Sequence, residues 1–206
     1  MHSKQIVSAG VKLGDADKVL IMLHGRGASA EDILTLATHL DVKDYTLLAP
    51  QATNHTWYPF SFLAPAEQNE PWLSSALDLL NDLVNDVVAK EIEKKNIRFL
   101  GFSQGACLML EFVMRNATRY GGIAAFTGGV IGNKINIDNY KGDFGQTPVF
   151  LGTSDPDPHI PVERFYATSN ILKNMNAAVT EKTYSNMGHT INQDEIDKAN
   201  NIVFRQ

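Results

Sequence analysis

The chain has 206 residues, of which 44% are hydrophobic and 20% are charged, so it is long enough for a buried core and is neither disordered nor a charge-driven coiled coil. The formal net charge of −5 argues against nucleic acid as a partner, because phosphate binding requires clustered cations. The lone cysteine, Cys107, can form neither an internal disulfide nor a multi-cysteine zinc site, which favours a reducing compartment and a cytoplasmic location.

Short apolar runs alternate with longer helical patterns along the chain. We expect strands at residues 6–11, 18–23, 45–49, 97–100, 122–126, 149–151 and 179–184. The spacing of apolar residues predicts helices at 33–40, 71–92, 106–116, 162–175 and 194–204. This alternation indicates an α/β fold with a mostly parallel sheet, in one domain over residues 1–206. The longest apolar run, Val19 to Leu23, is far shorter than the ~20 residues of a membrane span, so we expect no stable membrane insertion.

The segment 51–70 has no clear period and is long for a connection between two elements. Long connections in compact proteins are usually functional or disordered, and the aromatic residues here argue against disorder. Together with the start of the next helix, the segment supplies apolar side chains that could line an acyl pocket: Trp57, Tyr58, Phe60, Phe62, Leu63 and Trp72. The alternative is that most of these rings only pack the segment onto the body of the protein.

A candidate nucleophile follows the strand at 97–100. Gly101-Phe102-Ser103-Gln104-Gly105 matches G-x-S-x-G, the pattern of a serine held on a sharp turn between a strand and a helix. The small residues on either side let strand and helix approach closely, and the turn aims the next amide at the reaction centre. The pentapeptide alone is a weak signal, but its position between an apolar strand and a helix makes it specific.

A serine hydroxyl needs a histidine as base and a carboxylate to orient that histidine. In this arrangement the acid and then the histidine follow the serine in the chain, and His189 comes directly after the last expected strand. The turn after the strand at 149–151 offers both Asp155 and Asp157. Asp155, Asp157 and His159 could also be read as a metal cluster, but two prolines stiffen the segment and no distant ligand set completes it, so we expect no metal.

A second glycine-rich turn, His24-Gly25-Arg26-Gly27, follows the strand at 18–23. Its glycines allow the loop to lie close to the serine, where a backbone N–H could stabilise a developing oxyanion. With the amide that follows the serine, this predicts an oxyanion hole made by the backbone N–H groups of Arg26 and Gln104.

These motifs, in this order, resemble the phospholipase/carboxylesterase family of α/β-hydrolases, which includes acyl-protein thioesterases and small bacterial carboxylesterases. The resemblance implies an α/β-hydrolase fold without a large cap domain, and maps the catalytic serine and histidine onto Ser103 and His189. The family's acid lies four residues before the proline of a Val-Pro or Ile-Pro pair, here Pro161, which selects Asp157. Members are often dimers, so a homodimer is among the assemblies that the resemblance suggests.

The sequence therefore predicts a serine hydrolase that cleaves small or medium carboxylic esters through an acyl-enzyme, without metal or organic cofactor. An acyl-protein thioesterase or lysophospholipase, acting on a lipid-like substrate, is the main alternative. Thioesterases of the family often have leucine where this chain has Arg26, which argues against a long acyl chain. A non-catalytic ligand-binding protein of the same fold is a more distant alternative. We expect Cys107 to serve packing rather than chemistry.

Overall fold

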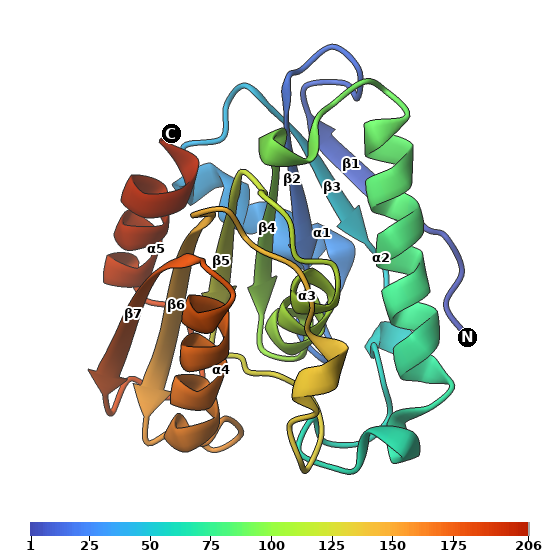
Figure 1. The fold of residues 1–206 in the computed structure, drawn as a ribbon. Coiled ribbons are helices and arrows are strands. Elements are labelled where there is room, and N and C mark those ends of the chain that lie inside the picture. Colours follow the sequence, from blue (N-terminus) through green and yellow to red (C-terminus); the bar gives the residue numbers. More distant parts are fainter. Residues whose placement is uncertain (206) are drawn as a thin grey trace.

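The structure is a computed structural model that describes residues 1–205, and its centre is a seven-stranded sheet (Figure 1). The strands are β1 (Ile6–Gly10), β2 (Lys18–Leu23), β3 (Tyr45–Pro50), β4 (Ile97–Phe102), β5 (Gly122–Phe126), β6 (Pro148–Asp155) and β7 (Ala178–Ser185). Their order in the sheet is β1-β3-β2-β4-β5-β6-β7. Only the edge strand β1 runs antiparallel to its neighbour, so the expected mostly parallel sheet is confirmed.

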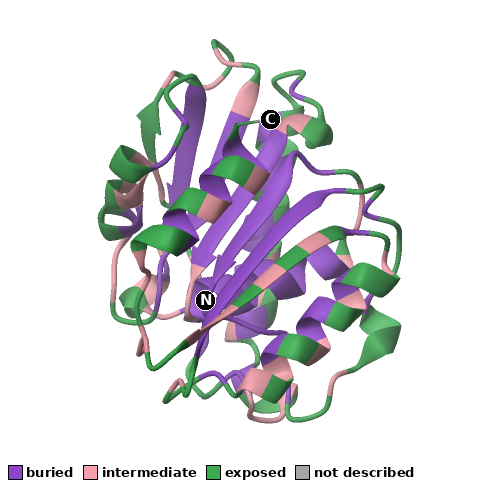
Figure 2. Cartoon of the chain, turned by 90° about the vertical axis from the view of Figure 1, so that its left-hand side faces the viewer, coloured by how far each residue is buried: buried purple, intermediate pink, exposed green. Residues whose placement is uncertain are grey.

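Helices cover both faces of the sheet, which Figure 2 shows as a buried layer. They are α1 (Ala30–Leu34), α2 (Trp72–Val88), α3 (Gln104–Arg115), α4 (Val162–Asn174) and α5 (Gln193–Ala199). Strand β2 shows why a continuous apolar run was needed. Val19, Ile21 and Leu23 pack in the same core as α2, α3 and α4, whereas Leu20 and Met22 face the core that includes α1 and α5. Alternate residues of the strand thus pack into the cores on opposite faces of the sheet.

Two of the predicted helices change to another helix type before they end. The segment expected at 33–40 forms α1, which Ser29 caps by accepting a hydrogen bond from the Asp32 amide at 3.2 Å, and then a 3₁₀ turn over Thr35–His39. The segment expected at 194–204 forms α5 and continues as a π-helical turn over Asn200–Phe204. The side chain of Asn200 binds the backbone of His39 and Asp41, and the change in helix type begins at this residue.

Helix α2 ends at Val88, and Ile92 is buried in the connection that follows rather than on the helix. Strand β6 is longer than expected and extends through Asp155. Among residues 1–205, no helix has the length and apolar character needed to cross a membrane. The carboxyl ends of β2, β4, β6 and β7 lie at one edge of the parallel sheet, so the loops that carry the candidate site residues converge there.

Candidate active site

Ser103 lies on a strained turn between β4 and α3. Its backbone has φ 54° and ψ −121°, a region that non-glycine residues rarely occupy. The turn requires glycine on both sides. A Cβ at Gly101 would lie 2.8 Å from the Cα of Ala106, and a Cβ at Gly105 would collide with the carbonyl of Leu23. The sharp strand-to-helix turn predicted from the pentapeptide is therefore present.

Three side chains from separate loops form one hydrogen-bonded chain. His189 Nε2 lies 2.8 Å from Ser103 Oγ, and its Nδ1 lies 2.9 Å from Asp157 Oδ2. His189 is carried by the loop after β7, where Gly188 has a φ of 79° and donates its amide to Ser154 Oγ at 3.0 Å. The structure thus brings together the serine, histidine and aspartate that the sequence singled out.

Asp157 is held so that one carboxylate oxygen faces His189. Its other oxygen, Oδ1, accepts the amides of His159 and Ile160, both at 2.8 Å. Burial alone would raise the pKa of Asp157, but the two amide bonds and His189 outweigh it and hold that pKa below its usual value. The carboxylate therefore stays ionised at neutral pH. Asp155 is exposed at the end of β6 and makes no side-chain bond to His189.

Two backbone amides are available beside Ser103. A Cβ at Gly25 would lie 3.5 Å from the Cβ of Ser103, which shows how closely the loop after β2 approaches the serine. Gln104 is the first residue of α3, where backbone N–H groups lack helical partners and the helix dipole is positive. Within residues 1–205, the amides of Arg26 and Gln104 donate to no protein acceptor. Both are free to bind an oxyanion.

The side chain of Gln104 has a structural task that the sequence did not reveal. Its Oε1 accepts the Trp57 amide at 3.0 Å and its Nε2 donates to the Tyr58 carbonyl at 2.8 Å. The residue that directly follows Ser103 therefore also ties the segment after β3 to the first turn of α3. In the sequence, the only sign of this role is that Gln104 is a polar residue at a position that becomes buried in the fold.

His24 was also missed as an anchor. It is fully buried, its Nδ1 is 2.8 Å from the Gly25 carbonyl, and its Nε2 accepts the Ala52 amide at 3.1 Å. Since an amide can only donate, Nε2 must be the acceptor and Nδ1 must carry the proton. Burial lowers the pKa of His24, so the ring stays neutral. Trp57 completes the anchor by donating Nε1–H to the His24 carbonyl at 2.8 Å.

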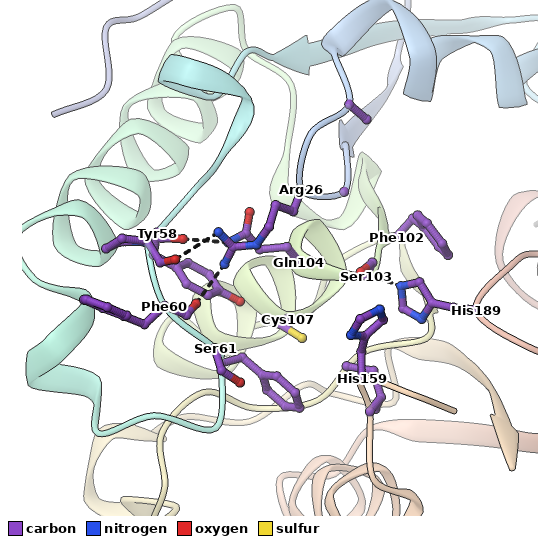
Figure 3. A pocket seen from close by; sticks show the side chains of 15 residues that line it. Arg26, Tyr58, Phe60, Ser61, Phe102, Ser103, Gln104, Cys107, His159 and His189 are labelled. Atoms are coloured by element: carbon purple, nitrogen blue, oxygen red, sulfur yellow. Dashed lines mark hydrogen bonds between the residues drawn. The ribbon is translucent and has the colours of Figure 1, made fainter. Parts of the chain in front are cut away.

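A pocket of about 460 Å³ opens beside Ser103 and His189 (Figure 3). Three of the six side chains expected to line an acyl pocket do so, namely Tyr58, Phe60 and Phe62. The other three, Trp57, Leu63 and Trp72, do not line it. The Trp57 ring packs against His24 with 5.0 Å between ring centres, and Trp72 packs against His2 at 5.4 Å. These rings pack the segment onto the body, as the alternative interpretation held.

Cys107, the fourth residue of α3, reaches the pocket wall (Figure 3). Burial raises the pKa of its thiol to about 12, so the nucleophilic thiolate is almost absent at neutral pH. In residues 1–205 no group of three or more His, Cys, Asp or Glu side chains is arranged to hold a metal ion. The expected interpretation of Cys107 as a packing residue fits its burial.

The mostly parallel sheet, its covering helices and the serine turn after β4 define an α/β-hydrolase. Comparison with known families makes this specific: the phospholipase/carboxylesterase model matches residues 3–204, and the chain belongs to this family. It is therefore a hydrolase of the carboxylesterase type.

Relatives of this family resemble the chain over nearly its whole length. A phospholipase/carboxylesterase from Dyadobacter fermentans has a crystal structure that superposes with a TM-score of 0.97 and is 52% identical, covering 98% of this chain and 97% of that one. Acyl-protein thioesterase 1 of Saccharomyces cerevisiae is 27% identical, covering 93% of this chain and 94% of the relative. A probable carboxylesterase SOBER1-like protein of Arabidopsis thaliana is 25% identical, covering 94% and 82%.

Proposed function

We propose that this chain hydrolyses carboxylic esters of small or medium acyl groups, with Ser103 as nucleophile, His189 as general base and acid, and Asp157 as the carboxylate that orients the histidine. The observation that supports this most directly is the continuous hydrogen-bond chain from Ser103 Oγ through both ring nitrogens of His189 to Asp157 Oδ2, at 2.8 and 2.9 Å. An ionised Asp157 requires the proton on Nδ1, which leaves Nε2 free to accept the serine proton.

In the proposed reaction, Ser103 Oγ attacks the ester carbonyl carbon as its proton passes to His189 Nε2. The carbonyl oxygen becomes an oxyanion, which the amides of Arg26 and Gln104 bind. His189 then gives its proton to the leaving alkoxide, so the ester C–O bond breaks and an acyl-enzyme remains. Water then attacks this acyl-enzyme as His189 takes one of its protons. The bond between the acyl carbon and Ser103 Oγ breaks, His189 returns the proton to Oγ, and the carboxylic acid is released. Loss of one such oxyanion donor typically lowers the rate by about 10²–10³-fold.

The proposed limit on acyl size comes from the side of the pocket formed by Tyr58 and Phe62. Both side chains are buried, with exposures of 1% and 6%, and both pack in the core that contains α2 and α3. A long chain would have to displace them or leave the pocket. The yeast relative named an acyl-protein thioesterase supports a second candidate, the hydrolysis of acyl thioesters, which the same serine and histidine could perform.

The test is a panel of 4-nitrophenyl esters from acetate to palmitate, together with one acyl thioester, assayed with the wild type and Ser103→Ala. Faster turnover of the short esters supports the proposal, and faster turnover of the thioester or long esters supports the second candidate. Ser103→Ala should remove nearly all turnover, because triad members act as a unit. Covalent labelling by a fluorophosphonate probe should also disappear in Ser103→Ala.

Paired substitutions test the choice of carboxylate. Asp157→Asn should lower kcat by about 10³–10⁴-fold, because an amide in place of the carboxylate favours the wrong histidine tautomer. Asp155→Asn is the matched control, since Asp155 is exposed two residues earlier on the same turn, and it should leave kcat nearly unchanged. The reverse result would assign the role to Asp155 and contradict the proposal.

A further inference from the structure

The side chain of Arg26 lies against the wall of the pocket with part of its guanidinium unused. Its Nη1 donates to Thr56 Oγ1 at 2.9 Å and to the Pro59 carbonyl at 3.0 Å, and its Nη2 donates to the Phe60 carbonyl at 2.8 Å. All these acceptors are neutral. A guanidinium has five N–H donors, so these bonds use both hydrogens of Nη1 and one of Nη2. The Nε–H and the second Nη2–H have no acceptor within residues 1–205.

The charge of Arg26 is not balanced by any carboxylate of the pocket. None of the described residues that line the pocket is an aspartate or glutamate, and Arg26 forms no ion pair with another residue of 1–205. The other ionisable side chains at the wall include His159 and His189, and neither carries a negative charge that could offset Arg26. The nearest carboxylate to the reacting groups belongs to Asp157, whose side chain is fully buried and paired with His189. The pocket therefore presents an excess of positive charge to its ligand.

The position of Arg26 relative to the reacting groups indicates which part of an ester would meet this charge. In Figure 3 the Arg26 side chain extends from beside Ser103 toward Tyr58 and Phe60, away from His189. In the proposed reaction His189 protonates the leaving group, so the alcohol lies on the His189 side of the serine. The acyl group then extends along the wall formed by Tyr58 and Phe60, where Arg26 is anchored.

We propose that the preferred substrates of this site are esters whose acyl group ends in a carboxylate, and that Arg26 is the residue that selects them. The unused donors on Nε and Nη2 can bind a carboxylate in the bidentate manner typical of arginine. The bonds to Thr56, Pro59 and Phe60 hold the guanidinium in place beforehand, which reduces the entropy lost on binding. This inference rests on the proposed ester hydrolysis and adds the chemical class of the acyl group.

The experiment compares pairs of esters of equal acyl length, one neutral and one anionic: 4-nitrophenyl butyrate with 4-nitrophenyl hemisuccinate, and 4-nitrophenyl valerate with 4-nitrophenyl hemiglutarate. The quantity measured is the ratio of kcat/KM for the anionic ester to that for the neutral ester, for the wild type, Arg26→Met and Arg26→Lys. Methionine keeps the backbone amide and much of the side-chain length but removes the charge. Lysine keeps the charge without the planar fork.

Arg119→Met is the matched control. Arg119 is also exposed and also donates to a backbone carbonyl, that of Gly145 at 3.1 Å, but it precedes β5 and so lies toward the opposite edge of the sheet from the active site. Its loss changes the net charge of the protein equally. Folding of each variant is checked by circular dichroism and thermal unfolding.

We expect the wild-type ratio to fall at least tenfold in Arg26→Met, to fall less in Arg26→Lys, and to be unchanged in Arg119→Met. Raising the salt concentration from 20 to about 500 mM should lower the wild-type ratio, because screening weakens only the charged interaction; this measurement needs no variant. An equal loss on both esters in Arg26→Met, or a wild-type ratio insensitive to salt, would overturn the inference. The proposed ester hydrolysis is tested separately by Ser103→Ala. If this variant is inactive on the neutral esters, that function stands even when the role of Arg26 is refuted. If Ser103→Ala remains active, the proposed function itself is refuted.

Discussion

Replacing Glu195 by glutamine tests how a buried carboxyl group in α5 affects stability. Glu195 is fully buried, and its Oε2 accepts the Asn192 amide at 3.0 Å in a capping box. Its Oε1 has no partner among the described residues and lies against Gly152, where there is no space for a Cβ. Burial raises the pKa of Glu195 from 4.5 to about 7, because the ionised form is poorly solvated there.

The size and sign of the effect follow from this pKa. Below pH 4.5 Glu195 is protonated in both the folded and the unfolded state. Between pH 4.5 and 7 the unfolded state releases the proton and the folded state keeps it, so the wild type loses stability as the pH rises. A pKa raised from 4.5 to about 7 corresponds to about 3 kcal/mol. Above pH 7 both states are ionised and the loss stays constant. Glutamine has nearly the same shape and does not titrate.

The assay is urea unfolding of the wild type and Glu195→Gln at pH 4.5, 5.5, 6.5 and 7.5, followed by tryptophan fluorescence, to which the buried Trp57 contributes. Taking the difference between the two proteins at each pH cancels the titration of every other group. Glu195→Gln should gain about 3 kcal/mol relative to the wild type between pH 4.5 and 7.5. A difference for Glu195→Gln that does not change with pH would refute the reasoning.

Three further predictions concern the groups around the serine. His24 stays neutral in the folded protein because burial lowers its pKa, whereas in the unfolded chain it takes up a proton below about pH 6.5. The stability of the wild type relative to His24→Gln should therefore decrease as the pH falls below 6.5. Urea unfolding that shows no such trend would contradict this assignment. Gly105→Ala would press a Cβ onto the Leu23 carbonyl and should cost about 1–3 kcal/mol or more, seen as a lower Tm, and an unchanged Tm would show that the turn can relax. Cys107, whose thiol pKa is raised to about 12, should react with Ellman's reagent only after unfolding, and rapid reaction of the folded protein would be the contrary result.

The parts of the site that could be predicted from the sequence are those that a local pattern determines. Ser103 could be found because the strained turn after a buried strand requires glycine on both sides of it. His189 could be found because it follows the last strand of a parallel sheet, and all such strands end at one edge. The fold class follows from the same alternation of strands and helices.

The division of the aromatic residues between pocket and core could not be predicted, because it depends on contacts with distant parts of the chain. Trp57 and Tyr58 are adjacent, yet Trp57 packs on His24 from another loop, whereas Tyr58 lines the pocket. The choice between Asp155 and Asp157 could be made only from the family resemblance, because their spacing leaves both open. It depends on where β6 ends and on the amides of His159 and Ile160, which the aspartate spacing alone does not reveal.

The double attachment of the segment at 56–60 matters for any effort to alter which esters this enzyme accepts. The side chain of Gln104 forms hydrogen bonds with the backbone of Trp57 and Tyr58. The side chain of Arg26 donates hydrogen bonds to the carbonyls of Pro59 and Phe60. Grafting a different loop here would therefore shift the two amides proposed to bind the oxyanion, and selectivity would be gained at the expense of rate. Phe60 is 54% exposed, and within residues 1–205 only its backbone carbonyl and amide form hydrogen bonds. A mutant library at this position could therefore explore new acyl groups while the backbone bonds that hold the segment stay in place.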